Sequence, residues 1–170
     1  MNSRISTSLP VWHPAFLIAT WFGSGLLPKI PGTWGSAAAL PFAVLIVWLG
    51  GQWALLAASL IAFAVGIWAA EVYGRHAGVK DPGAIVIDEV AGQWLTLVLL
   101  PMTPLAILIG FFYFRLFDIL KPWPANWADR DVPGGLGVML DDMIAGIYAA
   151  IATVLTYGAL MRFLFHETGI

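Results

Sequence analysis

The chain has 170 residues, of which 60% are hydrophobic and only 11% are charged, with a formal net charge of −2. A soluble domain carries about 25% charged residues, so this composition indicates one domain whose surface faces lipid rather than water. The absence of cysteine excludes thiol catalysis, cysteine metal sites and disulfides, and the lack of a basic run argues against a nucleic-acid partner. We therefore expect a single membrane-embedded domain over residues 1–170.

Apolar runs predict the helices in chain order. Residues 14–22 are too short to cross a bilayer, and Trp12 and Trp21 indicate an interfacial helix with its rings near the headgroups. Membrane-embedded helices are then predicted at about 35–49, 52–73, 82–100, 104–120 and 138–165, and the third could start later than residue 82. The first of these five is short for a full span, so it could form a re-entrant hairpin with the second.

Proline and glycine predict where these helices begin and end. Asp81 and Pro82 are typical of the cap and first position of the third helix, and Pro122 ends the fourth. The expected fold is an all-α, polytopic membrane bundle of about five membrane-embedded helices, some of which could be re-entrant, with an N-terminal interfacial helix.

Almost all charged residues fall at one end of this predicted bundle. The connections at 50–51 and 101–103 carry no charge, and the opposite helix ends carry sixteen of the eighteen formal charges. These sixteen include seven of the eight Lys and Arg residues, which places that end in the cytoplasm by the positive-inside rule.

Five acids lie at or inside apolar segments, where a carboxylate costs about 2.5–3.5 kcal/mol at the bilayer centre and less near the interface. They are Asp88, Glu89, Asp118, Asp141 and Asp142. In a purely structural interpretation, Arg115 and Lys121 pair with two of the acids, which leaves three unexplained. If Lys29 joins the cluster, the excess is two negative charges, which one divalent cation would neutralise. Because oxygen ligands suit Mg²⁺, the charge count favours a magnesium site over salt bridges alone.

Helical spacing brings these groups together. Arg115, Asp118 and Lys121 lie within an arc of about 120° on one face of the fourth helix. A glycine follows both Asp88 and Asp142 at a distance of four residues, and small residues at that spacing allow neighbouring helices to approach closely. The same glycines would serve packing alone equally well.

Two glycine-rich segments lie at the same end. LPKIPGTWGS, residues 27–36, offers Lys29, backbone N–H groups and the hydroxyls of Thr33 and Ser36, and VPGGLG, residues 132–137, leads into the last helix. Backbone N–H groups at a helix N-terminus suit an anion such as phosphate, although glycine and proline also mark ordinary turns.

Four motifs occur in an order that resembles the bacterial phosphatidylglycerophosphatase A family. They are PGTWGS at 31–36, IVIDE-x-x-G at 85–92, FRLFDILKPWP at 114–124 followed by Asp129 and Arg130, and GGLGVMLDDMIAG at 134–146. The resemblance covers about residues 12–155. It implies a Mg²⁺-dependent phosphoric monoester hydrolase of the bacterial inner (cytoplasmic) membrane, which converts the lipid phosphatidylglycerophosphate to phosphatidylglycerol at the cytoplasmic face.

The expected site combines these residues. The candidate catalytic residues and direct or water-mediated Mg²⁺ ligands are Asp88, Glu89, Asp118, Asp141 and Asp142, and the candidate phosphate ligands are Lys29, Thr33, Arg115 and Lys121. Mg²⁺ usually takes only one or two protein carboxylates, so some acids would orient water or protonate the leaving oxygen. The nucleophile could be water or an aspartate, and the sequence predicts no oligomeric state.

Three other classes of protein compete with this interpretation. A small transporter would carry charges near the bilayer midplane or on both faces, which the uncharged opposite end argues against. Another phospholipid headgroup enzyme, a CDP-alcohol phosphotransferase, would need a D-G-x-x-A-R run that the sequence lacks. A structural membrane subunit would not need five acids.

Overall fold

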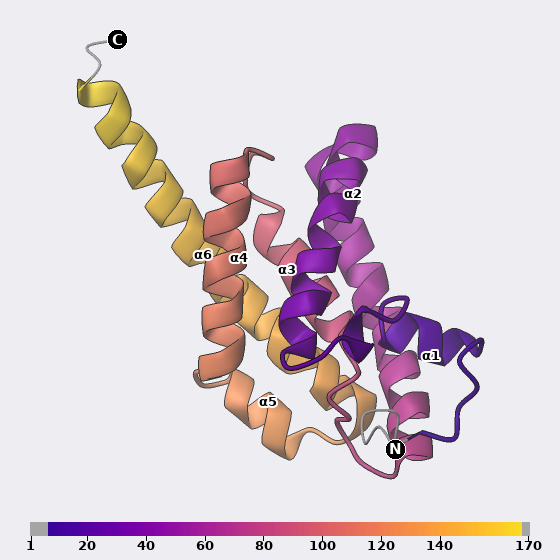
Figure 1. Cartoon of the computed structure of the whole chain (residues 1–170). Helices are drawn as coiled ribbons and strands as arrows, with labels where there is room; N and C mark the ends of the chain where they lie inside the picture. Colours follow the sequence, from indigo (N-terminus) through magenta and orange to yellow (C-terminus); the bar gives the residue numbers. More distant parts are fainter. Residues whose placement is uncertain (1–6, 168–170) are drawn as a thin grey trace.

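A computed structural model describes residues 7–167, with side chains described to residue 164. The chain forms α1 (Pro14–Ala19), a 3₁₀ turn η1 (Ser24–Leu26), α2 (Pro31–Ala77), α3 (Ile87–Leu97), α4 (Pro104–Leu120), α5 (Ala125–Asp131) and α6 (Gly134–Glu167). No strand occurs among the described residues, which confirms the all-α prediction. In Figure 1, α2 and α4 stand along the bundle, α6 runs obliquely across it, and α1 and α5 lie at its lower end.

The helix labelled α2 is a hairpin of two helical arms. Gly51 leaves helical geometry with φ 74° and ψ −173°, a region that is essentially restricted to glycine. The chain reverses there, so the two arms lie side by side (Figure 1). Both arms pack on α3: the Trp94 indole donates to the Ala39 carbonyl at 2.9 Å, and the Ser59 hydroxyl donates to the Ala91 carbonyl at 2.8 Å. The predicted break between the first two membrane helices is therefore confirmed.

Among the helices of residues 7–167, only α2 and α6 are long and apolar enough to cross a membrane by length and composition. α4 has 17 residues and α3 only 11, which correspond to about 25 Å and 16 Å against a hydrocarbon core of about 30 Å. The third predicted helix starts later than residue 82, as the sequence left open, and it ends before the predicted residue 100, because residues 78–86 and 98–103 form irregular connections. Asp81 and Pro82 therefore do not begin α3, which starts at Ile87. The residue before it, Val86, donates its N–H to the Ala19 carbonyl at 2.8 Å.

The α2 turn and the α3–α4 connection lie at the same end of the bundle, here called the turn end (residues 49–52 and 98–103). Gln52 Nε2 donates to the Leu100 carbonyl at 2.5 Å, which supplies a partner for backbone beyond the end of α3. Such a partner is needed where backbone leaves a helix inside lipid. The opposite end, here called the site end, holds the start of α2, the end of α4, and α1 and α5 (Figure 1).

Several other boundaries differ from the prediction. The first arm of α2 begins at Pro31 rather than at residue 35, and α6 begins at Gly134, so 134–137 is helical rather than a loop. α5 lies in a segment for which no helix was predicted. Trp12 is 77% exposed, as an interfacial ring would be, but Trp21 packs edge-on against Phe42 and Trp94 and is held by the protein.

A glycine contact between α3 and α6 sets how closely these helices approach. A Cβ atom added at Gly92 would lie 2.5 Å from the Asp142 carbonyl oxygen, and one added at Gly146 would lie 2.7 Å from the Gly92 carbonyl oxygen. The Thr96 hydroxyl bridges the crossing, at 2.9 Å from the Gly92 carbonyl and 3.3 Å from the Gly146 carbonyl. The close approach that the glycine spacing predicted is therefore present.

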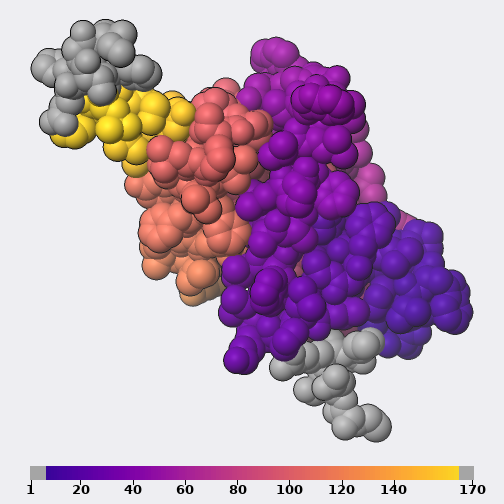
Figure 2. Space-filling model, turned by 45° about the horizontal axis from the view of Figure 1, so that its top comes forward, coloured from indigo at the N-terminus to yellow at the C-terminus, as the bar shows by residue number. Residues whose placement is uncertain are grey.

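Two views agree on the outer arrangement. Figures 1 and 2 both show the first arm of α2 beside α4, and Figure 2 shows the C-terminal part of α6 projecting beyond α4. α4 also packs on α6 and α3, so it closes the site end against both helices.

Candidate functional site

A small acidic cavity of about 120 Å³ lies at the site end. All five predicted acids line it, together with one predicted base and several residues from the α2 start and the α2–α3 connection: Asp88, Glu89, Asp118, Asp141, Asp142, Lys121, Pro31, Gly32, Asp81, Gly83 and Ile85. Four segments that are distant in the sequence therefore contribute to one cavity.

Three of the acids form its tightest group. Oxygens of Asp88, Glu89 and Asp142 all lie within 4.8 Å of one another, because the glycine crossing brings α3 against α6. Asp88 and Asp142 are 8% and 3% exposed. Glu89 Oε2 and Asp142 Oδ2 are buried and have no hydrogen-bond partner among the described residues. Buried oxygens of this kind are the ligands that a hard divalent cation prefers.

Arg115 on α4 faces this group. Its Nη1 atom lies 2.5 Å from Asp118 Oδ2, 3.9 Å from Glu89 Oε1 and 3.3 Å from the Ser36 hydroxyl oxygen. Ser36 is fully buried and donates its own hydroxyl to the Gly32 carbonyl at 2.9 Å, so α2 helps to hold the guanidinium in place. Arg115 Nε is buried and has no partner within the described chain, which leaves a donor available to an anion.

Lys121 ties α4 to α5 and α6. It caps α4 in the left-handed region with φ 43°, and its Nζ lies 2.6 Å from Asp141 Oδ2 and 3.0 Å from Asp129 Oδ1. Burial acts to lower the pKa of the Lys121 ammonium, but Asp141 and Asp129 outweigh that effect and raise the pKa above its ordinary value. Lys121 is therefore a permanent positive charge on the cavity wall.

The two other predicted phosphate ligands are not brought to this cavity. Lys29 is exposed with φ 74°, outside the helix that starts at Pro31, and Thr33 points about 100° around that helix from Gly32. Gly32 lines the cavity instead, and a side chain there would collide with the Glu89 carboxylate. Without Lys29, the five predicted acids face Arg115 and Lys121, so their excess is three negative charges rather than two, and Asp81, which also lines the cavity, makes it four.

Sequence reasoning missed the parts played by three residues. The sequence predicted Asp81 only as a helix cap and placed Asp129 only next to the third motif, whereas Asp81 lines the cavity and Asp129 pairs with Lys121. Ser36 was considered only as a hydroxyl for phosphate, and it contacts Arg115 instead. The adjacency of Asp81 to the IVIDE motif is the signal that could have indicated its place.

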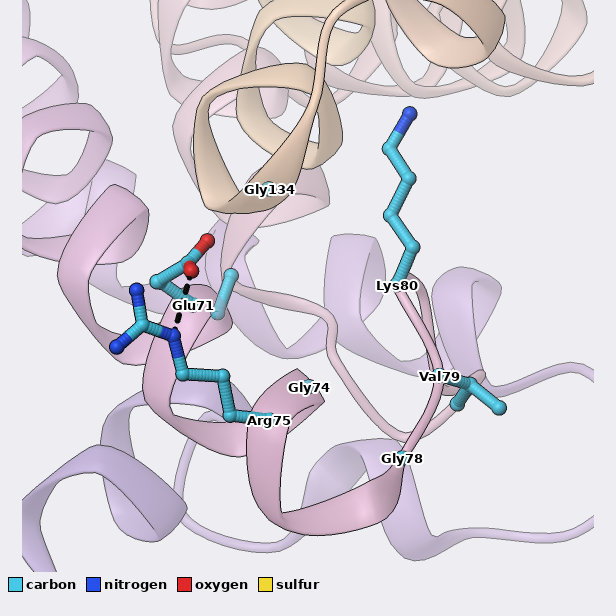
Figure 3. Close-up of a pocket in the computed structure, with 8 residues that line it drawn as sticks. Glu71, Gly74, Arg75, Gly78, Val79, Lys80 and Gly134 are labelled. Atoms are coloured by element: carbon cyan, nitrogen blue, oxygen red, sulfur yellow. Dashed lines mark hydrogen bonds and ion pairs between the residues drawn. The ribbon is translucent and has the colours of Figure 1, made fainter.

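A second, larger pocket of about 300 Å³ lies where the end of α2 meets the start of α6 (Figure 3). Glu71 pairs there with Arg75 at 2.8 Å and accepts the Gly135 N–H at 2.8 Å, which anchors the N-terminus of α6 to α2. Lys80 on the pocket wall donates to the Asp129 carbonyl. None of the five predicted acids lines this pocket, so its polar groups serve to position α6.

Fold and site together define a helical membrane protein with a carboxylate-rich cavity suited to a divalent cation and a phosphoryl group. The family model described as phosphatidylglycerophosphatase A matches residues 17–157. The chain belongs to this family, as the four motifs predicted.

Named relatives agree with this assignment. The chain is 43% identical over 150 residues to phosphatidylglycerophosphatase A of Escherichia coli K12, covering 88% of this chain and 84% of the relative. It is 39% identical over 140 residues to the protein of that name from Haemophilus influenzae Rd, covering 82% and 86%. A Bacteroides thetaiotaomicron protein, 36% identical over 155 residues and covering 82% and 92%, is provisionally named a phosphatidylinositol-3-phosphatase. No solved structure shows significant similarity to the chain.

Proposed function

We propose that this protein is a Mg²⁺-dependent phosphatase of the bacterial inner membrane that hydrolyses the terminal phosphate of phosphatidylglycerophosphate, yielding phosphatidylglycerol and inorganic phosphate. Family membership supports the lipid substrate. The concentration of Lys and Arg at the site end supports a cytoplasmic active site, because cytoplasmic segments carry the basic excess.

The carboxylate trio of Asp88, Glu89 and Asp142 carries the metal part of the proposal. Its oxygens lie within 4.8 Å of one another, and two of them are buried without a partner in the described chain. Several uncompensated negative charges in a buried site are costly unless a cation neutralises them. When bound there, Mg²⁺ would neutralise developing charge on the phosphoryl oxygens.

The remaining groups act on the phosphoryl group and the attacking water. Arg115 has an uncommitted Nε donor, and Lys121 supplies a fixed positive charge, so both stabilise negative charge as it builds up. Asp118 and Asp141 lie outside the trio and are held by these two bases. We assign them to orienting the water or protonating the leaving oxygen. Phosphate-monoester hydrolysis is among the slowest uncatalysed reactions, so several preorganised charges are reasonable here.

A single assay tests the proposal. Purified protein in detergent is mixed with phosphatidylglycerophosphate, and released phosphate is measured with Mg²⁺, with EDTA, and after Mg²⁺ is restored. We expect release with Mg²⁺, none in EDTA, and full recovery. Undiminished release in EDTA would refute the metal requirement, and no release under any of the three conditions would refute the substrate.

A further inference from the structure

Asp81 is a sixth acid of the cavity, and neither the trio nor the ion pairs use it. It lies in the 78–86 connection between α2 and α3 and lines the same cavity as Asp88 and Asp142. Those two acids are less than a tenth exposed, whereas Asp81 is exposed. Asp81 therefore stands at the mouth of the cavity, and the trio lies deeper.

The Asp81 carboxylate is uncommitted. Within residues 7–164 it takes part in no ion pair or hydrogen bond, and it lies outside the trio whose oxygens are within 4.8 Å. The two lysines that act electrostatically on it are both held by Asp129: Lys80 donates to its backbone carbonyl, and Lys121 pairs with its side chain at 3.0 Å. The acid at the mouth is therefore a free hydrogen-bond acceptor.

The chemistry of the proposed lipid substrate identifies a hydrogen-bond donor for the Asp81 carboxylate. A cavity of about 120 Å³ has room for a few water-sized groups, enough for a phosphoryl group and an ion. The glycerol that carries the phosphate must then lie at the mouth, on its way to the bilayer. Its free hydroxyl lies between two anionic phosphates and is the one neutral donor of the headgroup. The two phosphates repel a carboxylate at the mouth. A hydrogen bond that the carboxylate accepts from the hydroxyl offsets this repulsion.

We propose that Asp81 accepts a hydrogen bond from the free hydroxyl of the headgroup glycerol and so selects the alcohol that carries the phosphate. This inference rests on the proposed function and adds the group that distinguishes one lipid phosphate from another. Relatives of the chain bear names for two different headgroups, glycerol phosphate and inositol phosphate, so selection by a residue outside the phosphoryl-binding groups is consistent with the family.

The test compares two lipids that differ by one hydroxyl. Wild-type and Asp81→Ala protein are assayed with Mg²⁺ for kcat/KM on phosphatidylglycerophosphate and on an analogue in which 1,3-propanediol replaces the headgroup glycerol. The analogue keeps both phosphates, the spacing and the charge. We expect wild type to prefer the natural lipid by about tenfold or more, since a hydrogen bond to a charged group is lost with the analogue. In Asp81→Ala that preference should fall below about twofold.

Two further variants sharpen the result. Asp81→Asn keeps an oxygen acceptor and should retain part of the preference. Asp131→Ala removes an exposed acid of α5 that does not line the cavity, and it should keep the whole preference.

Each contrary outcome has a defined meaning. The inference is wrong if wild type hydrolyses both lipids equally, if Asp81→Ala keeps the preference, or if Asp81→Ala loses activity on both lipids alike. In all three cases the proposed function stands, because wild type hydrolyses phosphatidylglycerophosphate. If wild type hydrolyses neither lipid, the proposed function fails and this inference fails with it.

Discussion

Among single residues, the ion pairs of the cavity divide its five predicted acids into two sets. Asp118 and Asp141 each have a cation within 2.6 Å, whereas the closest cation contact of the trio is Arg115 Nη1, 3.9 Å from Glu89. Because a buried carboxylate without a cation is costly, the trio depends on a bound ion more than the paired acids do. The two sets should therefore respond differently to loss of charge.

Substitution of one acid from each set tests this division. Asp142→Asn should raise the Mg²⁺ concentration for half-maximal phosphate release by about tenfold or more, since even indirect metal partners contribute that much. Asp118→Asn should lower kcat by about a hundredfold with little change in the Mg²⁺ requirement. Mg²⁺ titrations at saturating lipid measure both effects, with Asp131→Asn as the surface control. A wild-type titration curve for Asp142→Asn would contradict the assignment of the trio.

The five acids, Arg115 and Lys121 lie together at one end of the bundle, where the sequence placed them, because a charge inside an apolar helix needs a partner or a function. Their catalytic and binding roles stay predictions. Lys29, Thr33 and Asp81 lie in or beside irregular backbone, where no periodicity says which way a side chain points. Their relation to the cavity depends on where α2 begins and on how the 78–86 connection folds.

At the level of helices, the contact of Gly92 with Gly146 sets the geometry of the trio. It brings the α3 acids within reach of Asp142 on α6. α3 is too short to span, so its position depends on these contacts and on the two arms of α2. The glycines were predicted to allow close approach, and the crossing they form is the element on which the site is built.

A methyl group at this crossing should damage both stability and activity. The Cβ of Gly146→Ala would lie 2.7 Å from a backbone oxygen of α3, and such overpacking typically costs about 1–3 kcal/mol. We expect a lower thermal unfolding temperature in detergent and reduced phosphate release.

Gly158→Ala on the same helix is the matched control, because its Cβ would meet nothing within 4 Å. It should leave both measurements unchanged or raise stability slightly, since alanine favours helix over glycine. If Gly146→Ala kept the stability and turnover of the wild type, the site would not depend on the close approach of α3 and α6.

Over the whole molecule, charge and topology agree. The α2 turn and the α3–α4 connection share one end, and the acids and bases of the cavity share the other. A bundle with this asymmetry has one strongly preferred orientation under the positive-inside rule.

The absence of cysteine makes this orientation directly measurable. Asp131→Cys at the site end and Pro101→Cys at the turn end each introduce a single, exposed thiol. With a membrane-impermeant maleimide, we expect intact spheroplasts to label only the turn end and inverted vesicles to label only the site end. The reverse pattern would overturn the cytoplasmic placement of the site.

Composition and local spacing were sufficient to predict the membrane class, the two arms joined at a glycine turn, and the end of the bundle at which the five acids gather. These features follow from short-range physics: hydropathy selects lipid, glycine permits a reversal, and an ion in an apolar helix demands compensation. The pairing of Asp141 with Lys121, the grouping of Asp142 with α3, and the place of Asp81 at the mouth depended on the three-dimensional fold. They arise from contacts between segments far apart in the chain, whose distances are set by the packing of whole helices rather than by neighbouring residues.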